Sequence, residues 1–324
     1  MFRVLAILVA AAIALSACGS GDDGGTAQAP SQPPAAKASD FPSAEGRTLG
    51  QLSEGLRQDA VLLPSSATSQ MAEGENRLGF VIVDTANKRL EPSAVAVYTA
   101  REDGTQLRGP FVARKESLEV ATPYRSAQTV SDLEEGKSFF LAAPEFASAG
   151  QRIVVGVAQV GGEMVLAQPT MALTVGAKGG PPDVGDRAVR VHTQTVSDVG
   201  GDLTKLTTRV PPAPELLKTD FADVLGKKPV VLQFATPALC SSRTCGPVVD
   251  IAEQVRAENG DGVAFIQQEI YVDNSPPKLR PQVEAWRLQT EPWLFVIDRE
   301  GTITARFEGV FSTGELARAV AAVK

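Results

Sequence analysis

Short apolar runs separated by turn residues dominate the chain between residues 49 and 178. Apolar or alternating runs cover residues 78–83, 94–98, 117–120, 138–142, 153–160 and 171–175. The breaks between them contain Gly, as at residues 102–104, 135–137 and 161–162, which favours turns. A period of two without helical spacing is typical of β-strands. We therefore expect an all-β antiparallel sandwich over residues 49–178.

The pattern changes after the Pro-rich residues 211–214. An apolar strand is expected at residues 230–234, a helix at 247–257 and a strand at 263–271. These are followed by a helix at 279–288, strands at 294–297 and 302–307, and a helix at 315–323. This order predicts an α/β layer domain over residues 215–324. Residues 179–214 are expected to be a linker, with His192 as a surface residue in it.

The amino terminus has the build of an export signal. Arg3 precedes an apolar run over residues 4–15, and small residues lead to Cys18. The run is shorter than the roughly 20 residues that cross a bilayer. Residues 18–48 are rich in Gly, Ala, Ser and Pro, with Phe41 as a large apolar side chain. We predict a signal peptide over residues 1–17 and a disordered tether over residues 18–48.

Composition restricts the possible chemistry. The chain has 31 Lys and Arg against 38 Asp and Glu, for a net charge of -7, so nucleic acid is not expected as a partner. One histidine and three cysteines exclude most His- or Cys-rich metal sites. The chain contains no Gly-x-Ser-x-Gly, and its Gly pairs do not join a strand to a helix. We therefore predict no metal and no cofactor, and look to the cysteines for chemistry.

Cys240 and Cys245 lie between the expected strand 230–234 and the expected helix 247–257. Free N–H groups at the start of a helix favour an anion, which lowers the pKa of a thiol placed there. On one regular helix their Cα atoms would be roughly 8–9 Å apart. A disulfide needs roughly 4.4–6.8 Å, so a bond requires Cys240 to lie in the loop before the helix. In an exported protein we expect the pair to be oxidised together.

The segment Leu15-Ser16-Ala17-Cys18 resembles the lipobox of bacterial lipoproteins. This resemblance implies that Cys18 is lipidated and becomes the first residue of the mature protein. The chain would then be anchored by lipid to the cell membrane, on its extracytoplasmic face. The expected partners are the membrane and, through the cysteine pair, the thiols or disulfides of exported proteins.

Residues 215–324 resemble the thioredoxin superfamily. Cys245-Gly246-Pro247-Val248 is similar to the Cys-Gly-Pro-Cys turn of that family, and Glu291-Pro292-Trp293 is similar to its cis-proline loop. The resemblance implies that Cys245 is the reactive thiol, that Cys240 resolves it and that Pro292 packs beside them. The full expected fold is thus an immunoglobulin-like β-sandwich followed by an α/β thioredoxin-like domain.

Peroxiredoxins provide a second resemblance, because residues 236–240 are similar to their peroxidatic loop. That similarity implies Cys240 as the nucleophile, with Thr236 and Arg243 beside it.

Three hypotheses for the function remain open. The first is thiol–disulfide exchange with exported proteins through Cys240 and Cys245. The second is a non-catalytic binding or scaffold lipoprotein whose Cys240–Cys245 disulfide is structural, and the third is peroxide reduction. Trp293 is either a core anchor or a lid over the thiols. A polar cluster at the end of the strand 264–271 is either a site or a solvated strand end; it comprises Glu269, Tyr271, Asp273 and Asn274.

Overall fold

The computed structural model describes residues 35–65, 70–132, 136–169, 172–240 and 242–324. The predicted signal peptide, Cys18 and the first part of the predicted tether lie outside the described residues. In the part that is described, Phe41 and Ala44 are buried, so residues close to Thr48 that were expected in the tether pack onto the folded protein.

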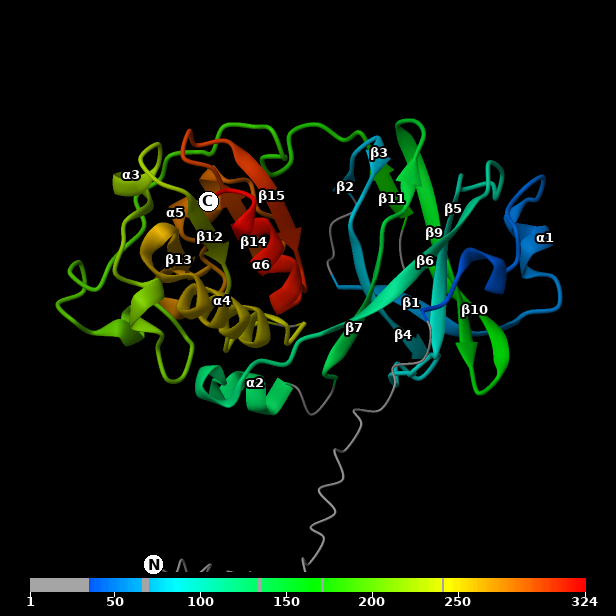
Figure 1. The fold of residues 1–324 in the computed structure, drawn as a ribbon, viewed down its shortest axis with the longest axis horizontal. Coiled ribbons are helices and arrows are strands. Elements are labelled where there is room, and N and C mark those ends of the chain that lie inside the picture. Colours follow the sequence, from blue (N-terminus) through cyan, green and yellow to red (C-terminus); the bar gives the residue numbers. More distant parts are fainter. Residues whose placement is uncertain (1–34, 66–69, 133–135, 170–171, 241) are drawn as a thin grey trace, which may run out of the picture. The chain divides into compact units, whose positions relative to one another are not determined.

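The first half of the chain forms a closed β-barrel (Figure 1). The barrel strands follow one another around the ring in the order β10-β1-β4-β7-β6-β5-β9, and β10 pairs with β9 to close it. Neighbouring strands are antiparallel except for β1 and β10, which are parallel. The strands are β1 (Arg57–Pro64), β4 (Leu78–Asp84), β5 (Ala94–Ala100), β6 (Arg108–Ser117), β7 (Ser138–Ala142), β9 (Gly150–Val160) and β10 (Glu163–Pro169).

The expected fold class, an immunoglobulin-like sandwich followed by an α/β thioredoxin-like domain, is wrong. A sandwich keeps two sheets with free edges, whereas β10 here pairs with both β1 and β9. Alternation of buried and exposed residues requires only that one face of a sheet be covered, and a barrel interior meets that requirement equally well. The rest of the chain adds separate sheets and a few helices, not a clear second domain of the expected class.

Smaller elements complete the barrel region. Strand β11 (Ala172–Val175) pairs with β9 and with β2 (Gln70–Met71), and β3 (Gly74–Glu75) pairs with β8 (Glu145–Phe146). Helix α1 (Leu49–Ser53) precedes β1, and α2 (Ala127–Asp132) lies in the connection between β6 and β7. Short 3-10 helices cover Ala38–Asp40, Thr122–Tyr124, Leu203–Lys205, Pro214–Leu216, Gly260–Gly262 and Val272–Asn274.

The second half of the chain contains a mixed four-stranded sheet. Its order is β13 (Ala264–Gln268), β12 (Val230–Phe234), β14 (Trp293–Ile297) and β15 (Ile303–Glu308). Strand β12 is parallel to β13 and antiparallel to β14. Helix α4 (Cys245–Asn259) packs with α6 (Thr313–Ala321) on one face of the sheet. Residues of α3 (Phe221–Val224) and α5 (Pro281–Ala285) cover the other face.

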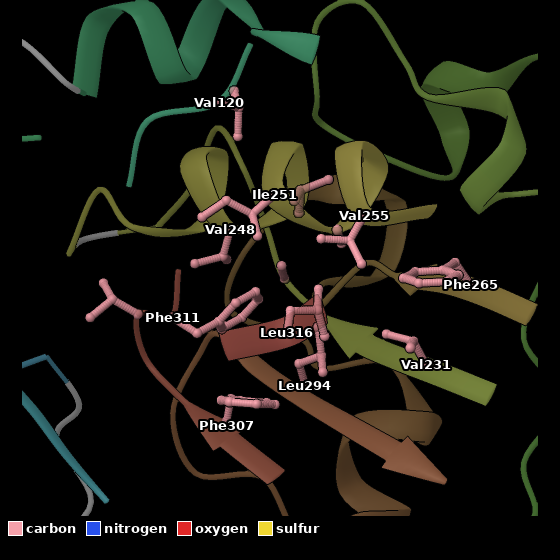
Figure 2. Packing of buried hydrophobic residues seen from close by; sticks show 14 of the residues in the cluster. Val120, Val231, Val248, Ile251, Val255, Phe265, Leu294, Phe307, Phe311 and Leu316 are labelled. Carbon is pink, nitrogen blue, oxygen red and sulfur yellow. The ribbon is translucent and has the colours of Figure 1, made fainter. Parts of the chain in front are cut away.

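Apolar side chains of α4 join these layers. Val248, Ile251 and Val255 point from α4 toward the sheet, where they meet residues such as Val231 and Leu294 (Figure 2). These positions recur every three to four residues, so one face of the helix is buried. Their burial explains why the predicted helix at residues 247–257 forms, and it fixes the carboxyl-terminal side of the cysteine loop.

Strand β7 is apolar on both faces because both are covered. Phe140 and Ala142 point into the barrel core, whereas Phe139 and Leu141 belong to the same cluster as α4. Successive residues of a strand face opposite sides. A continuous apolar run is therefore the expected sequence for a barrel strand whose outer face is also buried.

Candidate functional site

The cysteine loop leads from β12 into α4. It is held to β13 by two hydrogen bonds of Ala235, whose N–H donates to Gln268 O at 3.1 Å and whose carbonyl accepts from Gln267 Nε2 at 3.1 Å. Cys240 lies in this loop, and Cys245 is the first residue of α4. The structure thus places Cys240 before the helix, as a disulfide would require. It describes both residues as free thiols.

Cys240 is partly buried and lies among hydrogen-bonding groups. Its Sγ is 3.1 Å from Ser242 Oγ, which is itself 2.8 Å from Thr244 Oγ1. Hydrogen bonding from the Cys245 thiol, helped by Ser242 and by the N–H groups of Cys245 and Thr244, lowers the pKa of Cys240 to about 5 against the opposing effect of burial. The N–H groups at the helix start thus contribute to the stabilisation of the thiolate, but the Cys245 thiol contributes most.

Cys245 has the opposite environment. Its side chain is fully buried in the cluster formed by α4 and the sheet. Burial raises the pKa of Cys245 well above its ordinary value, and the hydrogen bond and negative charge of Cys240 raise it further. At neutral pH, Cys240 is therefore the thiolate and Cys245 keeps its proton. Exposure and acidity favour Cys240 as the reactive thiol, the reverse of the roles that the Cys-Gly-Pro turn implied.

Pro292 lies at the same end of the sheet as the cysteine loop. The Glu291–Pro292 peptide is cis, and β14 begins directly after it. Trp293 pairs with Phe234, the last residue of β12, so Pro292 and the start of the loop are adjacent. Trp293 is buried, donates from Nε1 to Thr290 Oγ1 at 3.0 Å and stacks on Phe295, which makes it a core anchor and not a lid.

Two acidic residues lie at the same end of the sheet as the pair, and one of them, Glu291, interacts with both cysteines. Glu291 is partly exposed, and burial together with the charge of Cys240 raises its pKa. Glu269, which follows β13, is fully buried, and this burial raises its pKa. Its Oε1 accepts from Ile270 N at 3.0 Å, and its Oε2 accepts from Thr208 N at 2.8 Å and Thr208 Oγ1 at 3.0 Å. Of the predicted polar cluster, Glu269 is therefore part of the core.

The remaining members of that cluster lie nearer the surface. Asn274 donates to Thr204 O at 2.7 Å and accepts from Arg280 at 3.0 Å, so it ties a turn to the segment before the sheet. The pKa of Tyr271 is raised, first by burial and then by the surrounding charges of Glu291 and the two cysteines. Tyr271 therefore borders the cysteine site, whereas Asn274 has a structural role.

The segment expected to be a linker contributes to the site. Thr207 and Arg209 are buried, and the Oγ1 of Thr208 accepts from Ala238 N in the cysteine loop at 3.0 Å. No apolar periodicity marks these residues, so pattern analysis missed them. By contrast, His192 is 59% exposed and bonds Asp220 through Nδ1 at 2.7 Å, which agrees with its prediction as a surface residue.

Neither residue expected beside a peroxidatic thiol is a main partner of Cys240 Sγ. Arg243 bonds the carbonyl of Cys240 through its backbone N–H at 3.2 Å. The hydroxyl of Thr236 is buried. The groups that chiefly stabilise the thiolate come instead from Cys245, Ser242 and Thr244.

Among the described residues, no set of three or more His, Cys, Asp or Glu side chains is placed to hold a metal ion. Within the same residues, no helix has both the length and the apolar character needed to cross a membrane.

Comparison with known proteins finds weak likenesses to solved structures. No family model matches the chain, and neither does any curated protein. A thioredoxin-like superfamily protein is 18% identical, with a TM-score of 0.26, over 33% of this chain and 85% of that one. The filamin domain of Lin-41 is 10% identical, with a TM-score of 0.20, over 38% of this chain and 95% of that one. Part of the chain thus has a weak thioredoxin-like structural neighbour, and scores this low establish no fold or activity.

Proposed function

We propose that this chain carries out thiol–disulfide exchange through Cys240 and Cys245. The observation that carries the proposal is the difference between the thiols: Cys240 is only partly buried and has its pKa lowered to about 5, whereas Cys245 is fully buried and has its pKa raised. The thiolate is the nucleophile in thiol–disulfide exchange. Because its pKa is about 5, Cys240 is a thiolate at neutral pH and can attack first, and Cys245 remains a thiol beside it.

The reaction has two balanced steps. The Cys240 thiolate attacks one sulfur of a partner disulfide, forms a mixed disulfide and releases the other partner sulfur as a thiolate. Cys245 then gives up its proton to the partner thiolate released in the first step, and its own thiolate attacks Cys240 Sγ. This closes a Cys240–Cys245 disulfide and releases the second partner sulfur. The partner is reduced by two electrons and the chain is oxidised by two; the reverse sequence oxidises a partner dithiol.

The reduction potential of the pair tests the proposal. In the full chain carrying Cys18→Ser, so that only the pair titrates, we expect a potential of roughly -270 to -120 mV. A potential below about -300 mV marks a structural disulfide and would favour a scaffold role instead. A complementary measurement is trapping. Cys245→Ser should accumulate a mixed disulfide with a disulfide-containing peptide, and Cys240→Ser, its matched control, should not.

For its location, we propose an exported lipoprotein anchored to the extracytoplasmic face of the membrane through Cys18. The sequence around Cys18 supports this, and the Gly-, Ala-, Ser- and Pro-rich tether that follows would hold the folded part away from the lipid. Labelling cells with a radioactive fatty acid tests it. The unmodified chain should incorporate label and sediment with membranes, and Cys18→Ser should do neither.

A further inference from the structure

We propose that Thr208 is a positioning residue, which holds the loop that carries Cys240 in place against the start of α4. The inference rests on the proposed exchange function and concerns the same site. Thr208 lies outside the α/β segment expected from the sequence, in a stretch without regular secondary structure.

The hydroxyl of Thr208 joins two parts of the site. A hydroxyl has one proton to donate and two lone pairs to accept with. Here it donates to Glu269 Oε2 at 3.0 Å and accepts from Ala238 N at 3.0 Å. Glu269 is fully buried and is also held by Ile270 N, so it is a fixed acceptor. The loop at Ala238 is therefore tied, through one side chain, to the end of β13.

The segment around Thr208 is itself held firmly. Gln128 of α2 brackets it, since its Nε2 donates to Thr208 O at 3.1 Å and its Oε1 accepts from Val210 N at 3.0 Å. Arg209 Nε donates to Asp250 Oδ1 of α4 at 2.7 Å. Two consecutive residues thus contact the segments on either side of Cys240. Thr208 bonds the loop before it, and Arg209 bonds the helix after it.

This position matters because hydrogen bonds to a thiolate depend on geometry. The Cys240 thiolate is stabilised first by the Cys245 thiol and then by Ser242 and the N–H groups of Cys245 and Thr244, and these bonds keep their geometry only while the loop stays in register with α4. The titratable groups that interact with Cys240 are Cys245 from α4, Glu291 before β14 and Tyr271 after β13, and Glu269 interacts in turn with Glu291 and Tyr271. Loosening the loop would weaken the hydrogen bonds and leave these acidic neighbours in place.

The experiment follows thiolate formation by Cys240 against pH, in full chains carrying Cys18→Ser. Thr208→Val keeps the shape and the backbone bond to Glu269 but removes both hydroxyl bonds. We expect it to raise the pH midpoint of Cys240 alkylation by at least about one unit, a tenfold change in proton affinity. Thr208→Ser should restore the midpoint. Thr204→Val, which removes an exposed hydroxyl that donates to Asp202 Oδ1 at 2.6 Å, should leave it unchanged.

An unchanged midpoint in folded Thr208→Val would overturn the proposal. If that variant does not fold, amide hydrogen exchange of the unmodified chain tests whether Ala238 N–H is held by the Thr208 hydroxyl. The Ala238 amide should exchange slowly although the residue is exposed. Rapid exchange would show that the hydrogen bond from Ala238 N to Thr208 Oγ1 does not hold the loop, and would overturn the proposal. Neither measurement needs a partner disulfide, so a failed positioning role and a failed exchange function are distinguishable.

Discussion

Arg209 Nε donates a hydrogen bond to Asp250 Oδ1 at 2.7 Å, and both side chains are buried. Asp250 Oδ2 also accepts from the N–H and hydroxyl of Ser126, at 2.6 and 2.9 Å. One carboxylate of α4 therefore joins three segments that are distant in sequence. Removing one partner of such a pair leaves an uncompensated charge in the core.

We expect Arg209→Met to lower the free energy of unfolding by about 3–5 kcal/mol. Urea unfolding followed by circular dichroism measures the change. Lys115→Met, which breaks the solvent-exposed pair between Lys115 and Glu91, is the matched control and should have little effect. A loss as small as that of the control would show that water reaches Asp250 in place of the guanidinium.

Ser242 is expected to help set the acidity of Cys240. Its hydroxyl is 3.1 Å from Cys240 Sγ, so Ser242→Ala removes one stabilising partner of the thiolate. The alkylation midpoint of Cys240 should rise above about 5, toward the ordinary thiol range. Ser53→Ala, which removes an exposed hydroxyl bond to Gly50 O, serves as the control. A midpoint that stays near 5 in Ser242→Ala would assign the effect to Cys245 and the helix start.

His192 should make stability depend on pH near neutrality. Its hydrogen bond to Asp220 raises its pKa above the ordinary value, so the protonated form is favoured in the folded state. This stabilisation is complete below the unfolded pKa of about 6.5 and is lost as pH rises through the folded pKa. His192→Gln should remove this loss of unfolding free energy as the pH rises above about 6.5. As this is the one histidine, its imidazole NMR resonance gives the pKa directly, and a value at or below about 6.5 would contradict the expectation.

Arg77 links the turn before β4 to α6. Its Nε and Nη2 bond the two oxygens of Glu315 at 2.9 and 3.0 Å, and Nη2 also reaches Val310 O at 2.6 Å. Lysine cannot reproduce this fork, so Arg77→Lys should cost about 1–3 kcal/mol in unfolding free energy. The same change at exposed Arg57 should be nearly neutral. Equal effects at the two positions would mean that the fork adds nothing to a single ion pair.

The sequence located the strands and helices better than it predicted their assembly. The helix expected at residues 247–257 is observed at Cys245–Asn259, and the strand expected at 230–234 is observed as β12. Both follow from local periodicity. Closure of the barrel depends on β10 pairing with β1, about a hundred residues earlier, and no local pattern encodes that partner.

The candidate site divides in the same way. The position of Cys240 and Cys245 at a strand-to-helix turn was expected from the local pattern, the cis peptide before Pro292 was expected from the resemblance to a cis-proline loop, and both are observed. Which thiol is acidic depends on burial, and burial depends on how α4 packs on the sheet. The participation of Thr208 and Arg209 was unexpected, because their partners Ala238 and Asp250 become neighbours only when the chain folds back on itself.

Residue order thus specified the places where chemistry is possible: one helix start, two sulfurs and a proline step. The helix start and the place of the two sulfurs follow from hydrophobic spacing over a few residues, and the proline step follows from its resemblance to a cis-proline loop. Closure of the barrel, the unequal acidity of the thiols and the tie from Thr208 came from folding. Each of them depends on solvent exclusion or on hydrogen bonds between distant segments, and these exist only in the packed molecule.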